Sequence, residues 1–271
     1  MGFDPVSYAM GAKAGGGGGG GATVEPLSVT ANGEYTAPEG KAYSPVTVDV
    51  FQMQSYATSI NGAFETGDDA AIVAQLSFPK KIVLDLPQCA NIAGAFRQYI
   101  ASAMFASGIE EVELTLTRPC QAQNFLNRNT TVKKVSFPNG LTITGGIYYF
   151  ISGNTALEEV IGEISILPGI TYDVTTAFQG TNLKTISFAH NTLYFPNTVF
   201  ASPVLTDESL VSIANGLNPT VSGASLSLHA TPKANCSLIV GTVADGVFTQ
   251  DAGGTVTLTD FITQTKGWTL A

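Results

Sequence analysis

Two pairs of adjacent glutamates are the residues in this sequence whose type and spacing could do chemistry. Glu110–Glu111 and Glu158–Glu159 each place two carboxylates side by side, as a general acid and base or a divalent metal ion would require. Each pair lies within a short apolar pattern whose neighbouring copies carry lysines at the same positions. Charge pairing between stacked copies explains the glutamates better than catalysis, so we expect both pairs to be structural.

The other residues capable of catalysis or metal binding form no known constellation. His190 and His229 show none of the HxH, HxxxH or HExxH spacings. We expect each to lie in a loop or in one of the stacked repeats (rungs) described below. Cys89, Cys120 and Cys236 are widely spaced without a CxxC pair, which indicates small core residues. A GxSxG nucleophile elbow is absent. We therefore predict that the protein is not an enzyme and uses no cofactor and no metal.

Tyrosines are the second set of candidates, because aromatic side chains with a polar end are favoured at recognition surfaces. They cluster around the middle of the chain, and the candidate binding residues are Tyr148, Tyr149, Tyr172 and Tyr194. The alternative is that such rings pack in the core, which we expect for the adjacent Phe150.

The elements that position these residues are copies of one apolar pattern. Its copies are PKKIVL, IEEVEL, VKKVSF, LEEVIG and LKTISF, which begin at residues 79, 109, 132, 157 and 183. The fourth positions of these copies are separated by 30, 23, 25 and 26 residues and are Ile82, Val112, Val135, Val160 and Ile186. This period predicts a solenoid over residues 76–204, in which each repeat adds one short strand and a return segment to a shared core. A second core stripe inside the returns is expected from Phe105, Phe125, Phe150 and Phe178.

Charge alternates from one copy to the next. The two variable positions read Lys80–Lys81, Glu110–Glu111, Lys133–Lys134, Glu158–Glu159 and then Lys184. Because stacked strands lie about 4.7–4.9 Å apart, like charges on neighbouring rungs would repel and alternating charges attract. The alternation therefore supports the predicted register.

The N-terminal part is predicted to be separate from the repeats. Residues 1–22 join a short peptide with Phe3 and Tyr8 to seven consecutive glycines, which indicates an anchor peptide on a flexible tether or an unstructured terminus. Residues 23–52 read as a small β unit with an Asn-Gly hairpin signal. A transition with a short helix, capped by an Asp-Asp pair, is expected over residues 53–75.

The C-terminal part, residues 205–271, is predicted to contain a helix and capping rungs. Within LTDESLVSIANGLN, Thr206 can cap a helix that Gly216 ends. Looser copies of the strand pattern follow at residues 224–228, 254–258 and 266–270.

Composition excludes several classes of protein. The chain has 271 residues, 44% of them hydrophobic and only 12% charged, with a net charge of −9. An acidic chain with 12 scattered bases lacks the basic patch that nucleic-acid binding needs. We also find neither an apolar run long enough to span a membrane nor a secretory signal at the start.

The repeats resemble the BspA-type leucine-rich repeat over roughly residues 76–200. The resemblance rests on VKKVSFPNG, LEEVIG and LKTISF, each preceded by the segments NFL, YFISGNTA or AFQGTN. It departs from the usual form in its variable repeat length and in Gly162. The resemblance implies a β-dominated solenoid with short strands and irregular or short helical returns.

The flanking parts resemble pieces of phage proteins. The tail, with LSLHATPKA and KGWTLA, looks like the C-terminal module of such repeats in phage and prophage proteins, and the N-terminal part is similar to tail-associated proteins of phages of Gram-positive bacteria. The resemblance implies a tail or baseplate adhesin of the virion, assembled in the host cytoplasm. Its N-terminal region would bind other virion proteins, and its repeats would bind a host cell-surface protein or glycan. Several copies could contact one host surface together, as a possible homo-oligomer. The alternatives are a bacterial leucine-rich-repeat adhesin on the cell surface, a protein-interaction module, or a purely architectural virion component.

Overall fold

The computed structural model describes three short N-terminal strands and most of the chain from residue 81 onward. The described segments are Ser28–Val29, Tyr35–Thr36, Val50–Gln54 and residues 81–96, 109–145, 147–168, 176–179 and 182–271. Phe3, Tyr8, the glycine run, the expected helix after Asp68–Asp69, Phe105 and Tyr172 lie outside the described residues.

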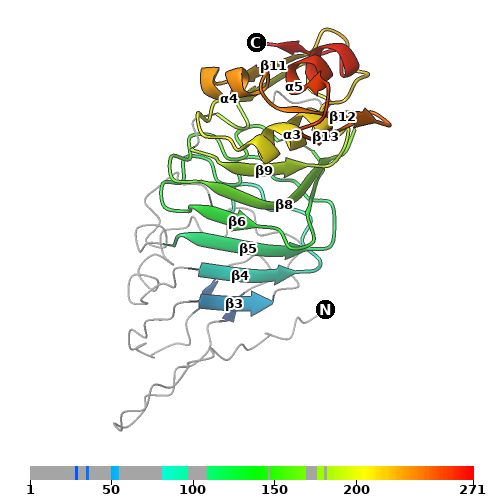
Figure 1. The fold of residues 1–271 in the computed structure, drawn as a ribbon. Helices are drawn as coiled ribbons and strands as arrows, with labels where there is room; N and C mark the ends of the chain where they lie inside the picture. The colour runs from blue at the N-terminus through cyan, green and yellow to red at the C-terminus, as the bar shows by residue number, and fades with distance from the viewer. Residues whose placement is uncertain are drawn as a thin grey trace.

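A parallel sheet forms the main body of the molecule, with its strands stacked one above another (Figure 1). Its strands are β3 (Val50–Gln54), β4 (Lys81–Leu86), β5 (Glu111–Leu116), β6 (Lys134–Ser136), β7 (Leu141–Ile143), β8 (Glu159–Ile166) and β9 (Thr185–Phe188). The register pairs Ile82 with Val112, Val112 with Val135, and Val135 with Val160. The predicted repeat register is confirmed, and the fold is a β-dominated solenoid of about five turns with little helix.

The sheet begins earlier in the chain than the repeats predict. β3 pairs in parallel with β4, although its sequence does not show the repeat pattern. Ahead of it, β1 (Ser28–Val29) and β2 (Tyr35–Thr36) pair antiparallel around the Asn-Gly signal. The expected boundary between residues 52 and 53 therefore falls inside β3.

One rung of the sheet is interrupted. β6 and β7 pair with the first and second halves of the long strand β8, and the loop Phe137–Gly140 separates them. Opposite this loop, Gly162 has a φ of +102°, and a Cβ atom there would collide with the carbonyl oxygen of Phe137. Gly162, where the repeat departs from its pattern, is thus a glycine required by a bulge.

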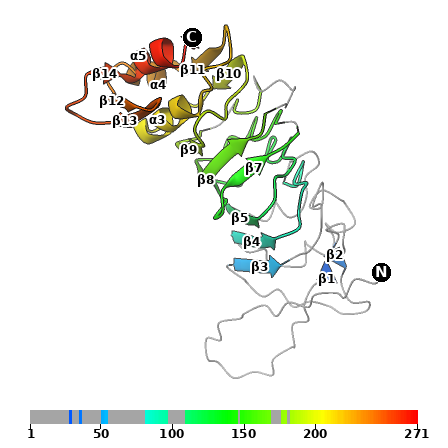
Figure 2. The ribbon, with the colours of Figure 1, turned by 90° about the vertical axis from the view of Figure 1, so that its right-hand side faces the viewer.

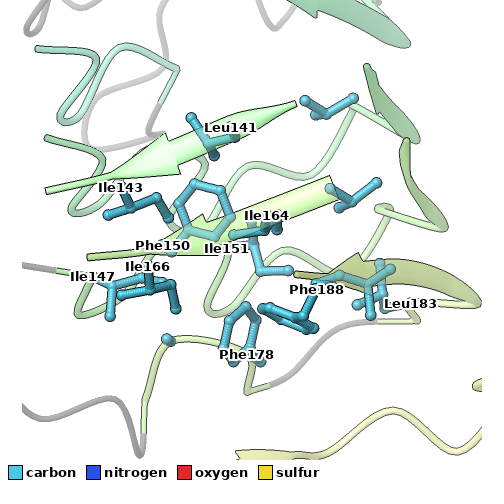
Figure 3. Packing of buried hydrophobic residues seen from close by; sticks show 14 of the residues in the cluster. Leu141, Ile143, Ile147, Phe150, Ile151, Ile164, Ile166, Phe178, Leu183 and Phe188 are labelled. Atoms are coloured by element: carbon cyan, nitrogen blue, oxygen red, sulfur yellow. The ribbon is translucent and has the colours of Figure 1, made fainter. Parts of the chain in front are cut away.

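The core is filled by the inward residues of the strands and by phenylalanines from the returns. Strands β4 and β5 alternate between half-buried and buried residues, so every second side chain enters the core. Phe125 and Phe150 stack with ring centroids 5.5 Å apart, and Phe178 stacks on Phe200 at 4.6 Å. Figure 3 shows Phe150 and Phe178 among isoleucines and leucines of the neighbouring rungs. The predicted phenylalanine stripe is confirmed for its three described members.

Beyond β9, the C-terminal elements gather at one end of the stack (Figure 2). A second parallel sheet contains β10 (Asn197–Phe200), β11 (Ser225–Leu228) and β15 (Thr269–Leu270), so residues 224–228 and 266–270 do form rungs.

The prediction of a rung at residues 254–258 is wrong. β14 (Val256–Thr257) pairs antiparallel with β12 (Val240–Ala244), which also pairs with β13 (Val247–Gln250). The tight turn at Asp245–Gly246, where both φ angles are positive, folds the chain back as a hairpin. The short helices of this part are α4 (Ala230–Asn235), α5 (Leu258–Asp260) and the π-helical turn η1 (Phe261–Thr265).

Helix α3 (Asp207–Gly216) covers the last strand of the main sheet. As predicted, Thr206 caps it by accepting the N–H of Ser209, and the helix ends at Gly216. Where another strand would supply carbonyl groups, Ser209 and Ser212 accept the backbone N–H groups of Ile186 and Phe188 of β9. The helix therefore closes the edge of the sheet with side-chain hydroxyls.

Candidate binding surface

The charged pairs form a ladder of ion pairs between neighbouring rungs. Glu110 contacts Lys133 at 3.1 Å, Lys134 contacts Glu159 at 3.7 Å, and Lys184 contacts Glu158 at 2.6 Å. Lys81 reaches Glu113, one strand away, at 2.7 Å. The hydrogen bond from Lys184 and its positive charge lower the pKa of Glu158. Three of the four adjacent glutamates, Glu110, Glu158 and Glu159, are thus bound to lysines of neighbouring rungs, as the alternation of charge predicts.

The cysteines lie in the core, and two of them are poor nucleophiles. All three are buried, and none of them forms a disulfide. Burial, together with the nearby Cys89, raises the pKa of Cys120 to about 12, and burial together with Asp207 raises the pKa of Cys236 to about 11. Both thiols are therefore protonated near neutral pH, whereas thiol chemistry requires the thiolate.

The histidines lie in connecting segments, where they make hydrogen bonds to the backbone. His190 follows β9, with its Nε2 3.0 Å from the carbonyl oxygen of Gly246, and His229 caps α4. Across the described residues, no group of three or more His, Cys, Asp or Glu side chains is arranged to hold a metal ion. None of the helices in the same part of the chain has the length and apolarity of a membrane span.

Lys266 is a buried charged residue that the sequence analysis did not select. Only 2% of it is exposed, and its Nζ donates to Asn191 Oδ1 at 2.6 Å and to the carbonyl oxygen of Asn215 at 3.1 Å, with His190 Nε2 at 3.3 Å. The ring of Phe261 lies 5.3 Å away. Burial lowers the pKa of Lys266 to about 8. Lys266 is thus a structural contact that ties the C-terminal end to the turn after β9.

Of the four selected tyrosines, the structure brings Tyr148 and Tyr149 together in the return segment after β7. Their ring centroids are 5.8 Å apart at an angle of 79°. Tyr149 is 42% exposed, whereas Tyr148 is half-buried and Phe150, as predicted, is in the core. Tyr194 is half-buried in a different segment, just before β10, and it makes no ring contact within the part of the chain that the structure describes.

Tyr149 has an unusual backbone conformation that repeats along the stack. Its φ is +53°, and Asn124 and Gly94 have φ values of +56° and +61°. The N–H of Gly94 donates to the carbonyl oxygen of Gln123, and the N–H of Asn124 donates to that of Tyr148. Gly94, Asn124 and Tyr149 therefore occupy the same register position on three successive rungs.

This left-handed position suits glycine and asparagine but not tyrosine. A residue with a bulky side chain in this region costs about 1–2 kcal/mol relative to the right-handed conformation. The ring of Tyr149 does not recover that cost by entering the core, because it is among the exposed large apolar side chains. Strained residues are concentrated at functional sites, so Tyr149 is a candidate for a functional contact.

Asn124 is a neighbour of this tyrosine that the sequence analysis missed. It lies at the equivalent position of the preceding rung, and its Oδ1 accepts a hydrogen bond from Asn127 Nδ2 at 3.2 Å. A signal was present, since Asn124 precedes Phe125 just as Tyr149 precedes Phe150. Together, the half-buried Asn124 and the exposed Tyr149 give the return side of the solenoid a patch of uncharged side chains that solvent can reach.

Comparison of the chain with protein-family models, curated proteins and solved structures finds no match. The function must therefore be inferred from the chain itself.

Proposed function

We propose that the protein is a non-enzymatic binding protein whose ligand contacts the return side of the solenoid around Tyr149. The observation that carries this proposal is that Tyr149 is exposed and has a strained backbone conformation, whereas the two preceding rungs have asparagine and glycine at the same position. A ring held there at a cost to stability is explained by a contact with a ligand. The binding of the ladder carboxylates to lysines supports a role other than catalysis.

We further propose that the solenoid is a leucine-rich repeat of the BspA type and that the protein is a phage tail or baseplate adhesin. Support comes from the sequence resemblance of the repeats and of both flanking parts. In this role the N-terminal residues, with Phe3 and Tyr8, attach the protein to other virion proteins, while the repeats face the host cell. The second candidate is a bacterial leucine-rich-repeat adhesin on the cell surface. The same repeats would then form its binding surface.

Binding of the full chain to intact cells tests the binding role. The fluorescently labelled protein is incubated with a panel of Gram-positive bacteria, and cell-bound fluorescence is measured. We expect binding to some strains, with a loss of up to about tenfold in Tyr149→Asn, because aromatic contacts contribute up to about 1.5 kcal/mol beyond the area they bury. The control is Leu238→Asn, which removes another exposed apolar side chain, in the C-terminal part beyond the repeats. Equal binding by both variants, or no binding to any strain, overturns the proposal.

Incorporation into particles separates the two adhesin roles. A full-length variant with Phe3→Ser and Tyr8→Ser is produced during phage assembly beside the unaltered protein, and purified particles are analysed by mass spectrometry. Recovery of the unaltered protein and loss of the variant support the virion role. Absence of both from particles, together with surface display on the producing bacterium, supports the bacterial adhesin.

A further inference from the structure

We propose that the surface around Tyr149 binds a neutral, hydroxyl-rich glycan. This inference rests on the proposed function, because it names the ligand class of the same surface. It is carried by four uncharged side chains on two consecutive rungs, which are Gln123, Asn124, Tyr148 and Tyr149.

The register arranges these four residues as a two-by-two array. The hydrogen bond from the N–H of Asn124 to the carbonyl oxygen of Tyr148 aligns Gln123 with Tyr148 and Asn124 with Tyr149. Neighbouring rungs are about 4.7–4.9 Å apart, so each amide lies within reach of the same ligand as the tyrosine beside it. All four residues are at least partly exposed. The hydrogen bond from Asn127 to Asn124 Oδ1 orients the Asn124 amide.

The chemistry of this array matches a saccharide. A carboxamide and a phenol each offer both a donor and an acceptor, which is what a sugar hydroxyl needs as a partner. The flat apolar face of Tyr149 suits the C–H face of a sugar ring, while its hydroxyl remains available for a polar contact. An extended glycan could contact both rungs at once.

Other ligand classes fit the array less well. Residues 119–127 and 135–157 carry no charged side chain, and the nearest cation in the sequence of these two rungs, Arg128, lies beside Gly153 and outside the array, so the array itself offers no cation for an anionic ligand. A peptide that adds as a strand needs free backbone groups. Here the N–H groups of Asn124, Leu126 and Ile151 donate along the stack to the carbonyl oxygens of the next rung. The backbone of this surface is therefore occupied within the solenoid.

The test compares cells whose surface components have been removed selectively. Strains that bind the full-length protein are treated either with periodate, which oxidises vicinal hydroxyls of sugars, or with proteinase K. We expect periodate to abolish binding and proteinase K to leave it unchanged.

A second experiment measures affinity directly. Protein-free neutral polysaccharide extracted from the same cells is titrated calorimetrically against the unaltered protein, Asn124→Gly, Gln123→Ala and the control Leu238→Asn. Asn124→Gly keeps a residue suited to the left-handed position and should bind a few-fold more weakly, as should Gln123→Ala, since each loses a net hydrogen bond of about 1 kcal/mol.

The outcomes distinguish this inference from the proposed function. Binding that survives periodate and is lost after proteinase K overturns the glycan inference and leaves a protein receptor as the ligand of the same surface. Failure of untreated cells to bind overturns the proposed function itself. Affinity for the polysaccharide that falls steeply with salt contradicts a neutral ligand, because only charged contacts are screened.

Discussion

The hydroxyl oxygen of Ser212 lies 2.8 Å from the backbone nitrogen of Phe188 and accepts its N–H. One turn earlier on α3, Ser209 accepts the N–H of Ile186 at 3.0 Å and donates to the carbonyl oxygen of Lys184. Near the end of the helix, Asn215 exchanges two hydrogen bonds with the backbone of Phe248 in β13. Helix α3 thus satisfies two strand edges, which would otherwise be open to pairing with other chains.

Removing these hydroxyls should destabilise the C-terminal end of the sheet. In a Ser209→Ala, Ser212→Ala double variant, the amides of Ile186 and Phe188 lose their acceptors, and each buried unsatisfied donor costs about 1–3 kcal/mol. We expect a lower melting temperature and faster hydrogen exchange at both amides. Ser227→Ala is the control, since Ser227 is half-buried and makes no side-chain hydrogen bond within the described residues. Unchanged exchange at Ile186 and Phe188 would contradict the role assigned to α3.

Replacing the strained tyrosine should stabilise the protein. Tyr149→Asn places a residue suited to the left-handed conformation at a φ of +53° and relieves a cost of about 1 kcal/mol. For a domain of this size we expect a melting temperature higher by about 2–4 °C. The same variant should bind cells more weakly, so stability and binding change in opposite directions. A lower melting temperature would show that the ring of Tyr149 contributes to folding.

Reversing a charge in the ladder should destabilise the sheet in a salt-dependent way. Glu158→Lys places a third positive charge beside Lys184 and Lys133, both of which lower the pKa of Glu158. We expect a lower melting temperature at low salt, a smaller effect in about 0.5 M NaCl because of screening, and recovery when Lys184→Glu is added. The control is Glu163→Lys on the same strand, because Glu163 makes no ion pair within the described part of the chain. Equal effects of the two single reversals would contradict the ladder.

Lys266 should give stability a distinctive pH dependence. Its pKa falls from 10.5 to about 8 on folding, so between these values the unfolded state binds more protons than the folded state. The free energy of unfolding contributed by Lys266 must therefore rise between about pH 8 and pH 10.5. We expect urea denaturation to show this rise in the unaltered protein relative to Lys266→Met. The thiols Cys120 and Cys236 are present in both proteins, so their opposite contribution cancels. A constant difference between the two proteins across this range would contradict the prediction.

The register and the charge ladder could be predicted because both depend on short sequence patterns. A solenoid stacks equivalent residues, so the spacing of Ile82, Val112, Val135 and Val160 determines which residues pair. Helix α3 was likewise predictable from its Thr206 cap. The antiparallel strand β14 was not, because GTVTL has the same pattern as a rung, and the strand β12 with which it pairs lies outside that segment.

The candidate surface was only partly predictable. Residue type alone selected Tyr149, but its left-handed conformation and the position of Asn124 beside it arise from stacking, which a single repeat does not reveal. Tyr194 has the same residue type and lies elsewhere in the chain. The burial of Lys266 had no local signal, since its partners Asn191 and Asn215 come from segments 75 and 51 residues away.

The alternating ladder also restricts how this protein can change in length over evolutionary time. In register, Lys81, Glu111, Lys134 and Glu159 form a column in which the sign changes at every rung. Duplicating or deleting a single repeat within it would bring two like charges opposite each other, whereas gaining or losing two repeats would preserve the alternation. Repeat number in such a lineage should therefore vary in even steps, with the pair of rungs as the heritable unit.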